Sequence, residues 1–364
     1  MLDVLSIAYP FASVHSDAVG GAEQIVSALD AALVAAGHHS TVLAGPGSRV
    51  AGRLALVEVE AGELSSERIR RGQQRYFQKL QRLLAEHDFD LLHFHGCDCA
   101  RYLAQQPLPG SIPKLVTLHV PNDWYEPNLF RPDAGLSFAC VSNWQREHLP
   151  SQLHVRATIE NGVDLRRWRP LAEPQGDYVL CLGRISPEKG FDRALRAARS
   201  VDVPLLLAGQ VYAYPEHQRH FAEQIEPLLD ERRRFLGPVA GRRKRQLLAR
   251  ARCLAVTSQV SETSSLVAME ALACGTPVVV ASPGAPATLI EPGRTGLVVE
   301  DPSELGRAFE EVLALDRAAC RASAERRFDV RRTTASYLDL YRELASETVA
   351  SLRPELALER GLSA

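Results

Sequence analysis

The segment RCLAVTSQVSETSSLVAMEALACGTPVVVAS, residues 252–282, places a helix-like run between two strand-like runs. The first run, RCLAVTS, and the last, PVVVAS, are short and apolar, as is typical of buried strands. Between them SSLVAMEALACG has the apolar pattern of a helix, and Gly275 and Pro277 mark its end. A strand–helix–strand unit of this kind predicts a parallel sheet covered by helices.

Short apolar runs alternate with longer helix-like runs along most of the chain. In the first half the strand-like runs are DVLSIAY, STVLAG, ALVEVE, DLLHFH, KLVTLH, FACVS and ATIE. The alternation stops at residues 161–177, NGVDLRRWRPLAEPQGD, a stretch rich in proline, glycine and charge that is typical of a domain boundary. It then resumes with YVLCLG, PLLLAG, RRFLGPV, RCLAVTS, PVVVAS and TGLVVE.

This pattern predicts an α/β protein made of two Rossmann-like domains whose parallel sheets face a central cleft. We expect the domains at residues 1–165 and 166–332, and a C-terminal helix at 333–350 that can pack back on the N-terminal domain. Ligands of such sheets bind beyond the carboxyl ends of the strands. The cleft between the two domains is therefore the expected site.

The composition excludes several classes of protein. The chain has 364 residues, 46% of them hydrophobic, and a formal net charge of −2, which argues against nucleic acid as a partner. The seven cysteines show no disulfide spacing, and the two in Cys97-Asp98-Cys99 lie too close together for a tetrahedral metal site. MLDVLSIAYP lacks the features of a signal peptide, and no apolar run approaches the ~20 residues of a membrane span. We therefore expect a cytoplasmic protein.

Two glutamates of the opening segment, Glu262 and Glu270, lie eight positions apart. Eight residues make slightly more than two helical turns, so both carboxylates can lie along one face and point into the cleft. Carboxylates accept hydrogen bonds from vicinal hydroxyls, as in ribose and other sugars. The alternative is structural, because Glu270 stands among apolar residues and, once buried, would need a donor partner.

The first strand of the second half ends in CLGRISPEKG, which contains Gly183, Arg184 and Lys189. Two cations five residues apart across a turn can converge on one anion while Gly183 lets the backbone approach it, an arrangement that suits a diphosphate. The alternative, solvated loop charges, is weakened by their position at a strand's carboxyl end.

Gly20 and Gly21 precede a helix in PFASVHSDAVGGAEQ. Glycines at a helix N-terminus let backbone N–H groups approach a phosphate or a sugar. The spacing is not that of a dinucleotide-binding fingerprint, and a plain tight turn is an equal alternative.

Together these motifs resemble the retaining glycosyltransferases of family 4, which have the GT-B fold. The resemblance rests on GGAE at 20–23, TLH at 117–119, VSNW at 141–144, ENGVD at 160–164, LGRISPEKG at 182–190, and Glu262 and Glu270 followed by ALACGTPVV. It makes residues 1–165 the acceptor domain and 166–332 the nucleotide-sugar donor domain.

The resemblance implies a role for each matched residue. Arg184 and Lys189 would hold the donor diphosphate, Glu270 the ribose, and Glu262 the transferred sugar. His119 would lie near the anomeric carbon. Gly20 and Gly21 would belong to the loop that approaches the diphosphate and the acceptor. Gly183 would lie beside the diphosphate.

The function implied is transfer of a sugar from a nucleoside-diphosphate sugar to an acceptor hydroxyl, in glycan, glycolipid or natural-product biosynthesis. Uracil is the expected base because it is common among such relatives. No cofactor and no metal are expected, since the cations can stabilise the leaving group, and Asp88-Phe89-Asp90 is best explained as a polar turn.

Two alternative functions remain. One is another GT-B enzyme, such as a sugar-nucleotide epimerase or a phosphorylase. The other is a catalytically silent nucleotide-sugar binding protein, because Thr263-Ser264-Ser265 replaces the Gly-Phe-Gly that usually follows the first glutamate in the family.

The acceptor is not specified by any motif, and glycan, lipid-linked and small-molecule acceptors all remain open. Residues 66–87 form an amphipathic helical pattern with apolar residues on one face and arginines largely elsewhere, among them Arg68. Peripheral contact with anionic lipid at the inner face of the membrane is one interpretation. A core-packing helix with a solvated basic face is the favoured one.

Overall fold

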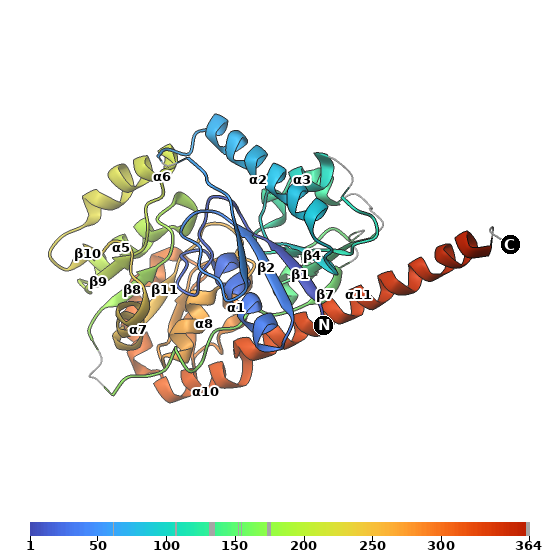
Figure 1. Cartoon of the computed structure of the whole chain (residues 1–364). Helices are drawn as coiled ribbons and strands as arrows, with labels where there is room; N and C mark the ends of the chain where they lie inside the picture. Colours follow the sequence, from blue (N-terminus) through green and yellow to red (C-terminus); the bar gives the residue numbers. More distant parts are fainter. Residues whose placement is uncertain are drawn as a thin grey trace.

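The computed structural model describes residues 1–60, 62–105, 108–130, 135–151, 153, 155–172 and 176–361, with the side chains of these ranges except Gln105 and 348–361. Two parallel sheets lie side by side, each with helices packed against it (Figure 1). The predicted α/β architecture, two Rossmann-like domains of the GT-B fold, is confirmed.

The N-terminal sheet has seven parallel strands in the order β3-β2-β1-β4-β5-β6-β7. The strands are β1 (Asp3–Ile7), β2 (His39–Ala44), β3 (Arg53–Leu56), β4 (Leu91–Phe94), β5 (Lys114–Leu118), β6 (Leu136–Cys140) and β7 (Val155–Thr158).

The C-terminal sheet has six parallel strands in the order β10-β9-β8-β11-β12-β13. The strands are β8 (Val179–Leu182), β9 (Leu205–Ala208), β10 (Arg233–Phe235), β11 (Cys253–Val256), β12 (Val278–Val280) and β13 (Gly296–Val298).

Helices connect the strands and cover the sheets. They are α1 (Gly21–Ala35), α2 (Ser66–Glu86), α3 (Cys99–Gln105), α4 (Asn143–Glu147), α5 (Phe191–Ser200), α6 (Pro215–His220), α7 (Gly241–Arg250), α8 (Leu266–Ala273), α9 (Leu305–Glu311), α10 (Arg317–Arg327) and α11 (Val330–Gly361). A π-helical turn (Phe221–Ile225) follows α6, and 3₁₀ turns occur at Asn122–Trp124, Pro127–Phe130, Pro187–Lys189, Glu226–Leu228, Ala285–Leu289, Pro302–Glu304 and Val312–Ala314.

The strand–helix–strand segment at residues 252–282 folds as β11, α8 and β12. Strands β11 and β12 pair in parallel, with Leu254 opposite Val278. Helix α8 is buried on almost every side, which explains why its sequence is apolar all round.

Three strands, β3, β6 and β7, begin two residues earlier than predicted. The run ALVEVE, residues 55–60, was expected to be a strand, but β3 spans Arg53–Leu56. Its partner β2 ends at Ala44, which pairs with Leu56 and accepts one last hydrogen bond from the Val57 amide. Because the parallel ladder has no further partner, the strand ends there.

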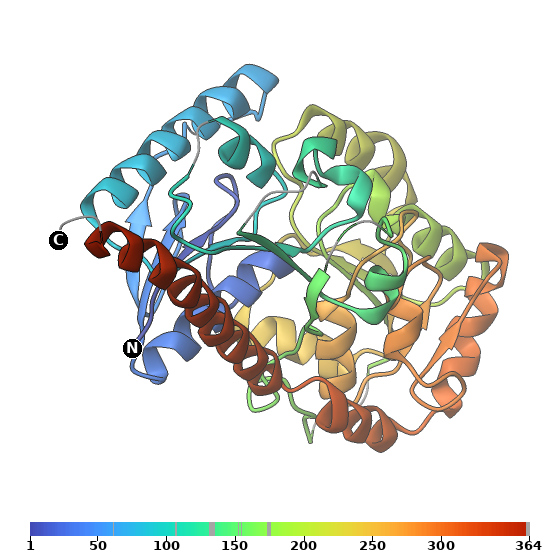
Figure 2. The same cartoon turned by 90° about the vertical axis from the view of Figure 1, so that its right-hand side faces the viewer.

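Helix α11 packs on the N-terminal domain although it follows the C-terminal one (Figure 2). It begins at Val330 and contacts α1 and β4. Two buried tyrosines fix it: Tyr341 Oη lies 2.7 Å from His93 Nδ1, and Tyr337 Oη lies 3.0 Å from Thr117 Oγ1. The C-terminal helix therefore ties the two domains together.

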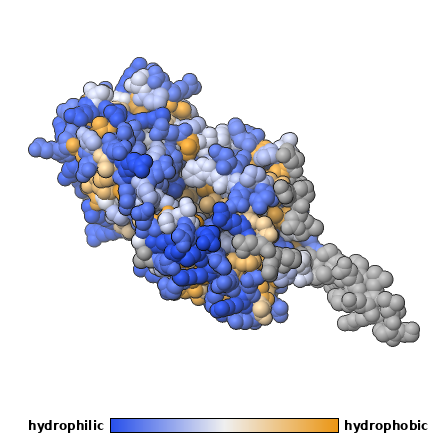
Figure 3. Space-filling model, turned by 90° about the horizontal axis from the view of Figure 1, so that it is seen from above, coloured by the Kyte–Doolittle hydropathy of each residue, from blue (hydrophilic) through white to orange (hydrophobic). Residues whose placement is uncertain are grey.

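Helix α2 packs its apolar face into the N-terminal core, where Tyr76, Phe77 and Leu80 are buried. Arg68 differs from expectation, because it is buried and its Nη1 donates to the Glu63 carbonyl at 2.7 Å. The arginine thus folds back over the start of the helix, where its aliphatic part is buried. The face of the molecule that carries α2 and α6 is mostly hydrophilic (Figure 3).

No helix in the described ranges is both long and apolar enough to cross a bilayer.

Candidate functional site

A cavity of about 800 Å³ lies between the two domains. It is lined by the loops that follow β1, β4 and β5 in one domain and β8, β9 and β11 in the other. This is the position predicted from the carboxyl ends of the strands. The cavity brings together the residues singled out from the sequence, namely Gly20, Gly21, His119, Gly183, Arg184, Lys189, Glu262 and Glu270.

Glu262 is held in an ion pair with Lys189. Lys189 Nζ donates to Glu262 Oε1 at 2.7 Å, and the Ser258 hydroxyl donates to the same oxygen. Gly284 packs against the Glu262 backbone with a φ of +100°, and a Cβ there would lie 2.4 Å from the Glu262 carbonyl oxygen. The loop thus fixes this carboxylate at the cavity surface.

Glu270 lies inside α8 with none of its surface exposed, and it pairs with Lys244 of α7. Lys244 Nζ lies 2.8 Å from Oε1 and 2.7 Å from Oε2 of Glu270. Burial raises the pKa of Glu270, and the lysine opposes this shift. Lys244 also lies over the Trp168 ring, 4.9 Å from its centre.

The sequence analysis missed Lys244. It belongs to GRRKRQLLARAR and falls four residues before the buried Leu248, on the same helix face. The signal available in the sequence was a lysine on the apolar face of one helix, followed by a second helix that contains a buried glutamate. The donor partner that a buried Glu270 requires is therefore a lysine from the neighbouring helix.

Arg184 and Lys189 both reach the cavity, as predicted, but each faces a carboxylate in this structure. Arg184 Nη2 lies 3.4 Å from Glu188 Oε1. Lys189 ends a 3₁₀ turn, and Gly190 follows it with a φ of +58°, where a Cβ would lie 2.3 Å from the Thr257 carbonyl oxygen. The close packing of Gly190 sets the direction of the Lys189 side chain.

Gly183 lies directly against the next strand's end. A Cβ on Gly209, which has a φ of +154°, would lie 1.7 Å from the Gly183 carbonyl oxygen. Both glycines line the cavity, so the backbone surface beside Arg184 is flat and open to a ligand.

Gly20 and Gly21 begin α1 at the cavity wall. A Cβ on Gly20 would lie only 1.9 Å from Glu23 Oε2, so this carboxyl would have to shift to admit a larger residue. Burial raises the pKa of Glu23. A ligand that approaches the start of α1 therefore meets the Glu23 carboxyl as well as backbone amides.

His119 belongs to a buried group of three histidines. Its Nε2 shares a hydrogen bond of 3.0 Å with His95 Nδ1, and the His95 ring centre lies 3.8 Å from that of His93. Burial lowers the pKa of His119 to about 3 and lowers the pKa of His95 as well. Both imidazoles are neutral at pH 7, so they offer hydrogen bonds and no charge. His95 was not singled out, although it ends the strand run DLLHFH as His119 ends KLVTLH.

The three hydroxyls of Thr263-Ser264-Ser265 differ in their hydrogen bonding. Thr263 Oγ1 donates to the His119 carbonyl at 2.7 Å, and Ser142 Oγ donates to the Thr263 carbonyl at 2.7 Å, so Thr263 links the two domains. The hydroxyls of Ser264 and Ser265, which also line the cavity, have no hydrogen-bond partner within the described part of the chain. Buried polar groups normally have partners, so these two hydroxyls are exceptions.

No group of three or more histidine, cysteine, aspartate or glutamate side chains in the described ranges could hold a metal ion. Asp90 of the DFD stretch accepts a hydrogen bond of 2.7 Å from the Asp3 amide, at the amino end of the sheet.

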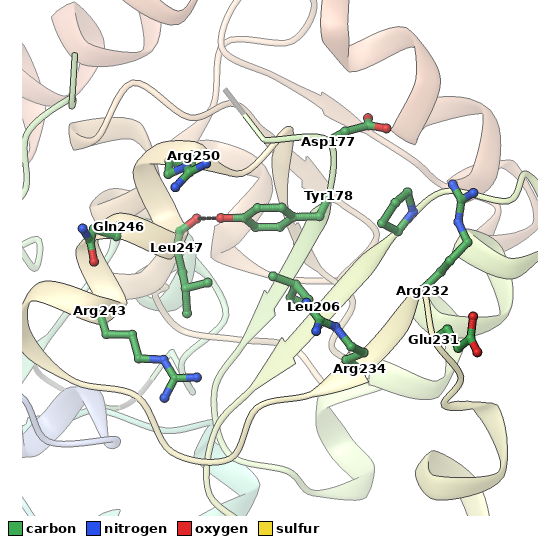
Figure 4. Close-up of a pocket in the computed structure, with 11 residues that line it drawn as sticks. Asp177, Tyr178, Leu206, Glu231, Arg232, Arg234, Arg243, Gln246, Leu247 and Arg250 are labelled. Carbon is green, nitrogen blue, oxygen red and sulfur yellow. Dashed lines mark hydrogen bonds between the residues drawn. The ribbon is translucent and has the colours of Figure 1, made fainter. Parts of the chain in front are cut away.

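A second hollow of about 670 Å³ lies on the donor domain, on the face of α7 that carries Leu247 (Figure 4). Tyr178 forms part of its wall and donates a hydrogen bond of 2.9 Å to the Leu247 carbonyl. Arginines surround it, but it contains none of the residues predicted to form the site.

Family models match both halves of the chain. A "Glycosyltransferase Family 4" model matches residues 19–167, and a "Glycosyl transferases group 1" model matches residues 176–314. The chain belongs to the family 4 glycosyltransferases. The family resemblance inferred from the motifs is thereby confirmed.

Curated proteins similar to this family 4 member include two D-inositol 3-phosphate glycosyltransferases. That of Saccharomonospora viridis is 34% identical over 215 residues, which are 51% of this chain and 49% of the relative. That of Geodermatophilus obscurus is 35% identical over 251 residues, 58% of this chain and 54% of the relative. The chain thus spans about half the length of the curated relatives it matches.

Solved structures share the fold of this family 4 member. Sucrose-phosphate synthase from Thermosynechococcus elongatus matches with a TM-score of 0.76 and 22% identity over 95% of this chain and 100% of that one. Anabaena HepE in complex with UDP and glucose matches with a TM-score of 0.72 and 19% identity over 94% of this chain and 100% of that one. At such identities the likeness establishes the GT-B fold.

Proposed function

We propose that this protein is a retaining glycosyltransferase that moves a sugar from a nucleoside-diphosphate sugar, with UDP as the first candidate carrier, to an acceptor hydroxyl. The observation that supports this most strongly is the pairing of Lys189 with Glu262 and of Lys244 with Glu270 in one cavity. Such a cavity offers cations for a diphosphate and carboxylates for sugar hydroxyls.

The diphosphate would bind between Arg184 and Lys189. Their side chains are partly exposed, at 34% and 24%, so both can turn toward an anion that enters the cavity. Charge-assisted hydrogen bonds to an anion contribute roughly 1.5–3 kcal/mol each. The flat backbone at Gly183 and Gly209 allows phosphate oxygens to approach.

The ribose would bind at Glu270. A carboxylate that a lysine holds in one orientation can accept hydrogen bonds from both vicinal hydroxyls of the ribose. The Lys244 ammonium keeps Glu270 charged against the cost of burial, which matters because only the charged form accepts at both oxygens.

The transferred sugar would bind beside Glu262. The unpartnered hydroxyls of Ser264 and Ser265 and the unpartnered Oδ1 of Asn161 lie around the same cavity. A sugar, with a hydroxyl on most carbons, could satisfy all three groups at once.

In the proposed reaction the bond from the anomeric carbon to the diphosphate oxygen breaks as the acceptor oxygen attacks from the same face. Arg184 and Lys189 stabilise the charge that develops on the departing diphosphate. The acceptor proton passes to the leaving phosphate oxygen. Neutral His119 orients the sugar by hydrogen bonding and transfers no proton, in keeping with its lowered pKa.

The similar proteins support UDP as the first carrier to test, because HepE was solved with UDP, with UDP and glucose, and with UDP-glucose. The acceptor would belong to glycan, glycolipid or natural-product biosynthesis. A cytoplasmic location is consistent with seven cysteines in the free form.

Calorimetry with UDP, GDP and ADP, without added metal, is the first test. We expect one nucleotide to bind clearly and Arg184→Ala to weaken it. The matching nucleotide sugar is then incubated with acceptors, and NMR of the anomeric proton in the product should show retained configuration. Failure of all three nucleotides to bind would contradict the proposal, and an inverted product would contradict its retaining chemistry.

A catalytically silent nucleotide-sugar binding protein is the second candidate. It is favoured by Thr263, whose hydroxyl is engaged by the His119 carbonyl and is not free for a sugar. Tight donor binding without hydrolysis or transfer would support it. Isomerised nucleotide sugar in the absence of acceptor would instead indicate an epimerase.

Peripheral contact of α2 with anionic lipid is a separate proposal. Arg70, Arg75 and Arg82 are exposed on this helix. Flotation with anionic vesicles at low and high salt tests it, and binding that does not depend on salt or on these arginines would rule it out.

A further inference from the structure

The wall of the cavity contributed by the N-terminal domain carries no cationic side chain. Among the described residues of this domain around the cavity, none is lysine or arginine, whereas Asp17 and Glu23 are acidic. The cations that line the cavity, Arg184, Lys189, Arg219 and Lys244, all come from the C-terminal domain.

The histidines of this wall do not supply the missing charge. Burial lowers the pKa of His95 and of His119, so both are neutral near pH 7. Asp17 is already engaged, since Arg167 pairs with it and the Gly241 amide donates to its Oδ1 at 3.1 Å. The wall therefore offers an anion no compensating charge.

Aromatic rings of both domains line this part of the cavity, Tyr9 and Phe11 from the N-terminal domain and Tyr212 and Tyr214 from the C-terminal domain. The rings of Tyr9 and Phe11 meet edge to face with centres 5.5 Å apart. Tyr9 Oη lies 3.3 Å from Tyr214 Oη, across the boundary between the domains. Tyr212 lies beside Tyr214, with ring centres 6.5 Å apart. We call Tyr9, Phe11, Tyr212 and Tyr214 the aromatic platform.

The platform is anchored in a fixed position. Phe11 packs against Gly72 of α2, where a Cβ would lie 2.6 Å from the ring. The loop that carries Tyr212 and Tyr214 is tied to the other domain, because the Leu64 amide donates to the Ala213 carbonyl at 3.0 Å. Rings held in this way lose little freedom when a ligand stacks on them.

The platform lies next to the proposed transfer point. Tyr212 lines the same cavity as Arg184, the arginine proposed to hold the diphosphate, and as Glu23 at the start of α1. An acceptor resting on the platform would have a hydroxyl close to the anomeric carbon.

We propose that the acceptor is an uncharged molecule with an apolar ring face, which packs among the rings of Tyr9, Phe11, Tyr212 and Tyr214, and that phosphorylated acceptors are disfavoured. The ring can be an aryl group or the apolar face of a pyranose, which share this stacking chemistry. The inference rests on the proposed glycosyl transfer. An acceptor of this kind differs from D-inositol 3-phosphate, for which the curated relatives are named.

The test compares three acceptors with the nucleotide-loaded protein: a phenol, a methyl hexoside and D-inositol 3-phosphate. Binding is measured by calorimetry in the presence of the nucleotide identified above, and transfer is measured with its sugar donor. We expect the phenol or the hexoside to bind at least tenfold more tightly than the inositol phosphate. Whichever of the phenol and the hexoside binds more tightly shows whether the ring is an aryl group or a pyranose.

Variants of the platform sharpen the test. Tyr212→Ala and Tyr214→Ala should each weaken the acceptor by about tenfold, the scale of one lost aromatic contact. Tyr214→Phe keeps the ring and should stay within about twofold. Thermal unfolding checks that the variants fold, and Arg307→Ala, on the exposed face of α9, is the control that should bind acceptor and nucleotide as the wild type does.

The outcomes separate this inference from the proposed function. Failure of the nucleotide to bind would overturn the glycosyl transfer and the acceptor inference with it. Normal nucleotide binding with a preference for D-inositol 3-phosphate, especially one lost in Arg219→Ala, would overturn the acceptor inference alone. Equal acceptor binding by Tyr212→Ala, Tyr214→Ala and wild type would do the same.

Discussion

The two walls of the cleft use polar groups in different ways. On the C-terminal wall the charged side chains are paired, with Lys189 2.7 Å from Glu262 and Lys244 2.7 Å from Glu270. On the N-terminal wall His95 and His119 are neutral and share a hydrogen bond, with aromatic rings beside them.

The difference indicates what each wall can bind. Buried ion pairs seldom add net stability, because desolvation offsets the attraction between the charges. Keeping the buried Lys244–Glu270 pair and the partly exposed Lys189–Glu262 pair at one cavity is better explained by a charged ligand such as a diphosphate. A neutral wall has little to offer an anion and suits an uncharged acceptor.

Removing a charged side chain from the C-terminal wall should give the largest effect. Lys189→Ala, Arg184→Ala and Glu262→Ala should each lower transfer by about a hundredfold or more, the scale of losing a pre-organised charge partner. Initial rates at several donor concentrations measure this. Arg307→Ala, on the exposed face of α9, is the matched control and should leave the rate unchanged. Rates near wild type in all three variants would remove the assignment of the site.

Glu270→Gln should affect binding and stability together. Nucleotide affinity should fall about tenfold or more, and the free energy of unfolding should fall by about 3 kcal/mol because Lys244 is left buried without its counter-ion. Calorimetry and urea unfolding measure the two effects. The double variant Glu270→Leu with Lys244→Met should recover stability but not affinity. If it recovered both, the pair would be structural only.

The free energy of unfolding should depend on pH through His95 in the N-terminal wall. His95 is neutral in the folded protein because its pKa is lowered, but in the unfolded chain it takes up a proton near pH 6.5. Its contribution to stability is therefore present above pH 6.5 and is lost as the pH falls, by up to about 1.4 kcal/mol per pH unit. His95→Asn should flatten the dependence of the free energy of unfolding on pH between 6.5 and 4.5. An unchanged slope would contradict a buried neutral histidine.

Loosening the C-terminal helix should give the smallest effect. Tyr341→Phe leaves His93 Nδ1 without its partner in the core and should cost about 1–2 kcal/mol in urea unfolding. Tyr337→Phe, which removes the contact with Thr117, is the companion variant and should cost a similar amount. Both should transfer sugar within about twofold of wild type. A large loss of activity would instead link α11 directly to the site.

Much of the fold follows from local sequence. Strand periodicity, helix ends and the stop at residues 161–177 depend on neighbours within a few positions, so they are visible without the structure. In a parallel sheet every strand's carboxyl end lies at the same edge. For this reason Arg184, His119 and Glu262 could be placed in one cleft from their positions after strands alone.

The partners of those residues could not be read from the sequence. Lys244 meets Glu270 across 26 positions, Lys189 meets Glu262 across 73, and Tyr9 meets Tyr214 across 205. Nor does the sequence tell that Thr263 binds the His119 carbonyl while Ser264 and Ser265 remain unpartnered. The chain alone thus determined which residues lie at the strand ends, because that depends on local periodicity. Only the tertiary structure decided which of them are paired, neutral or free, because those states depend on the packing of distant segments and on the burial that it produces.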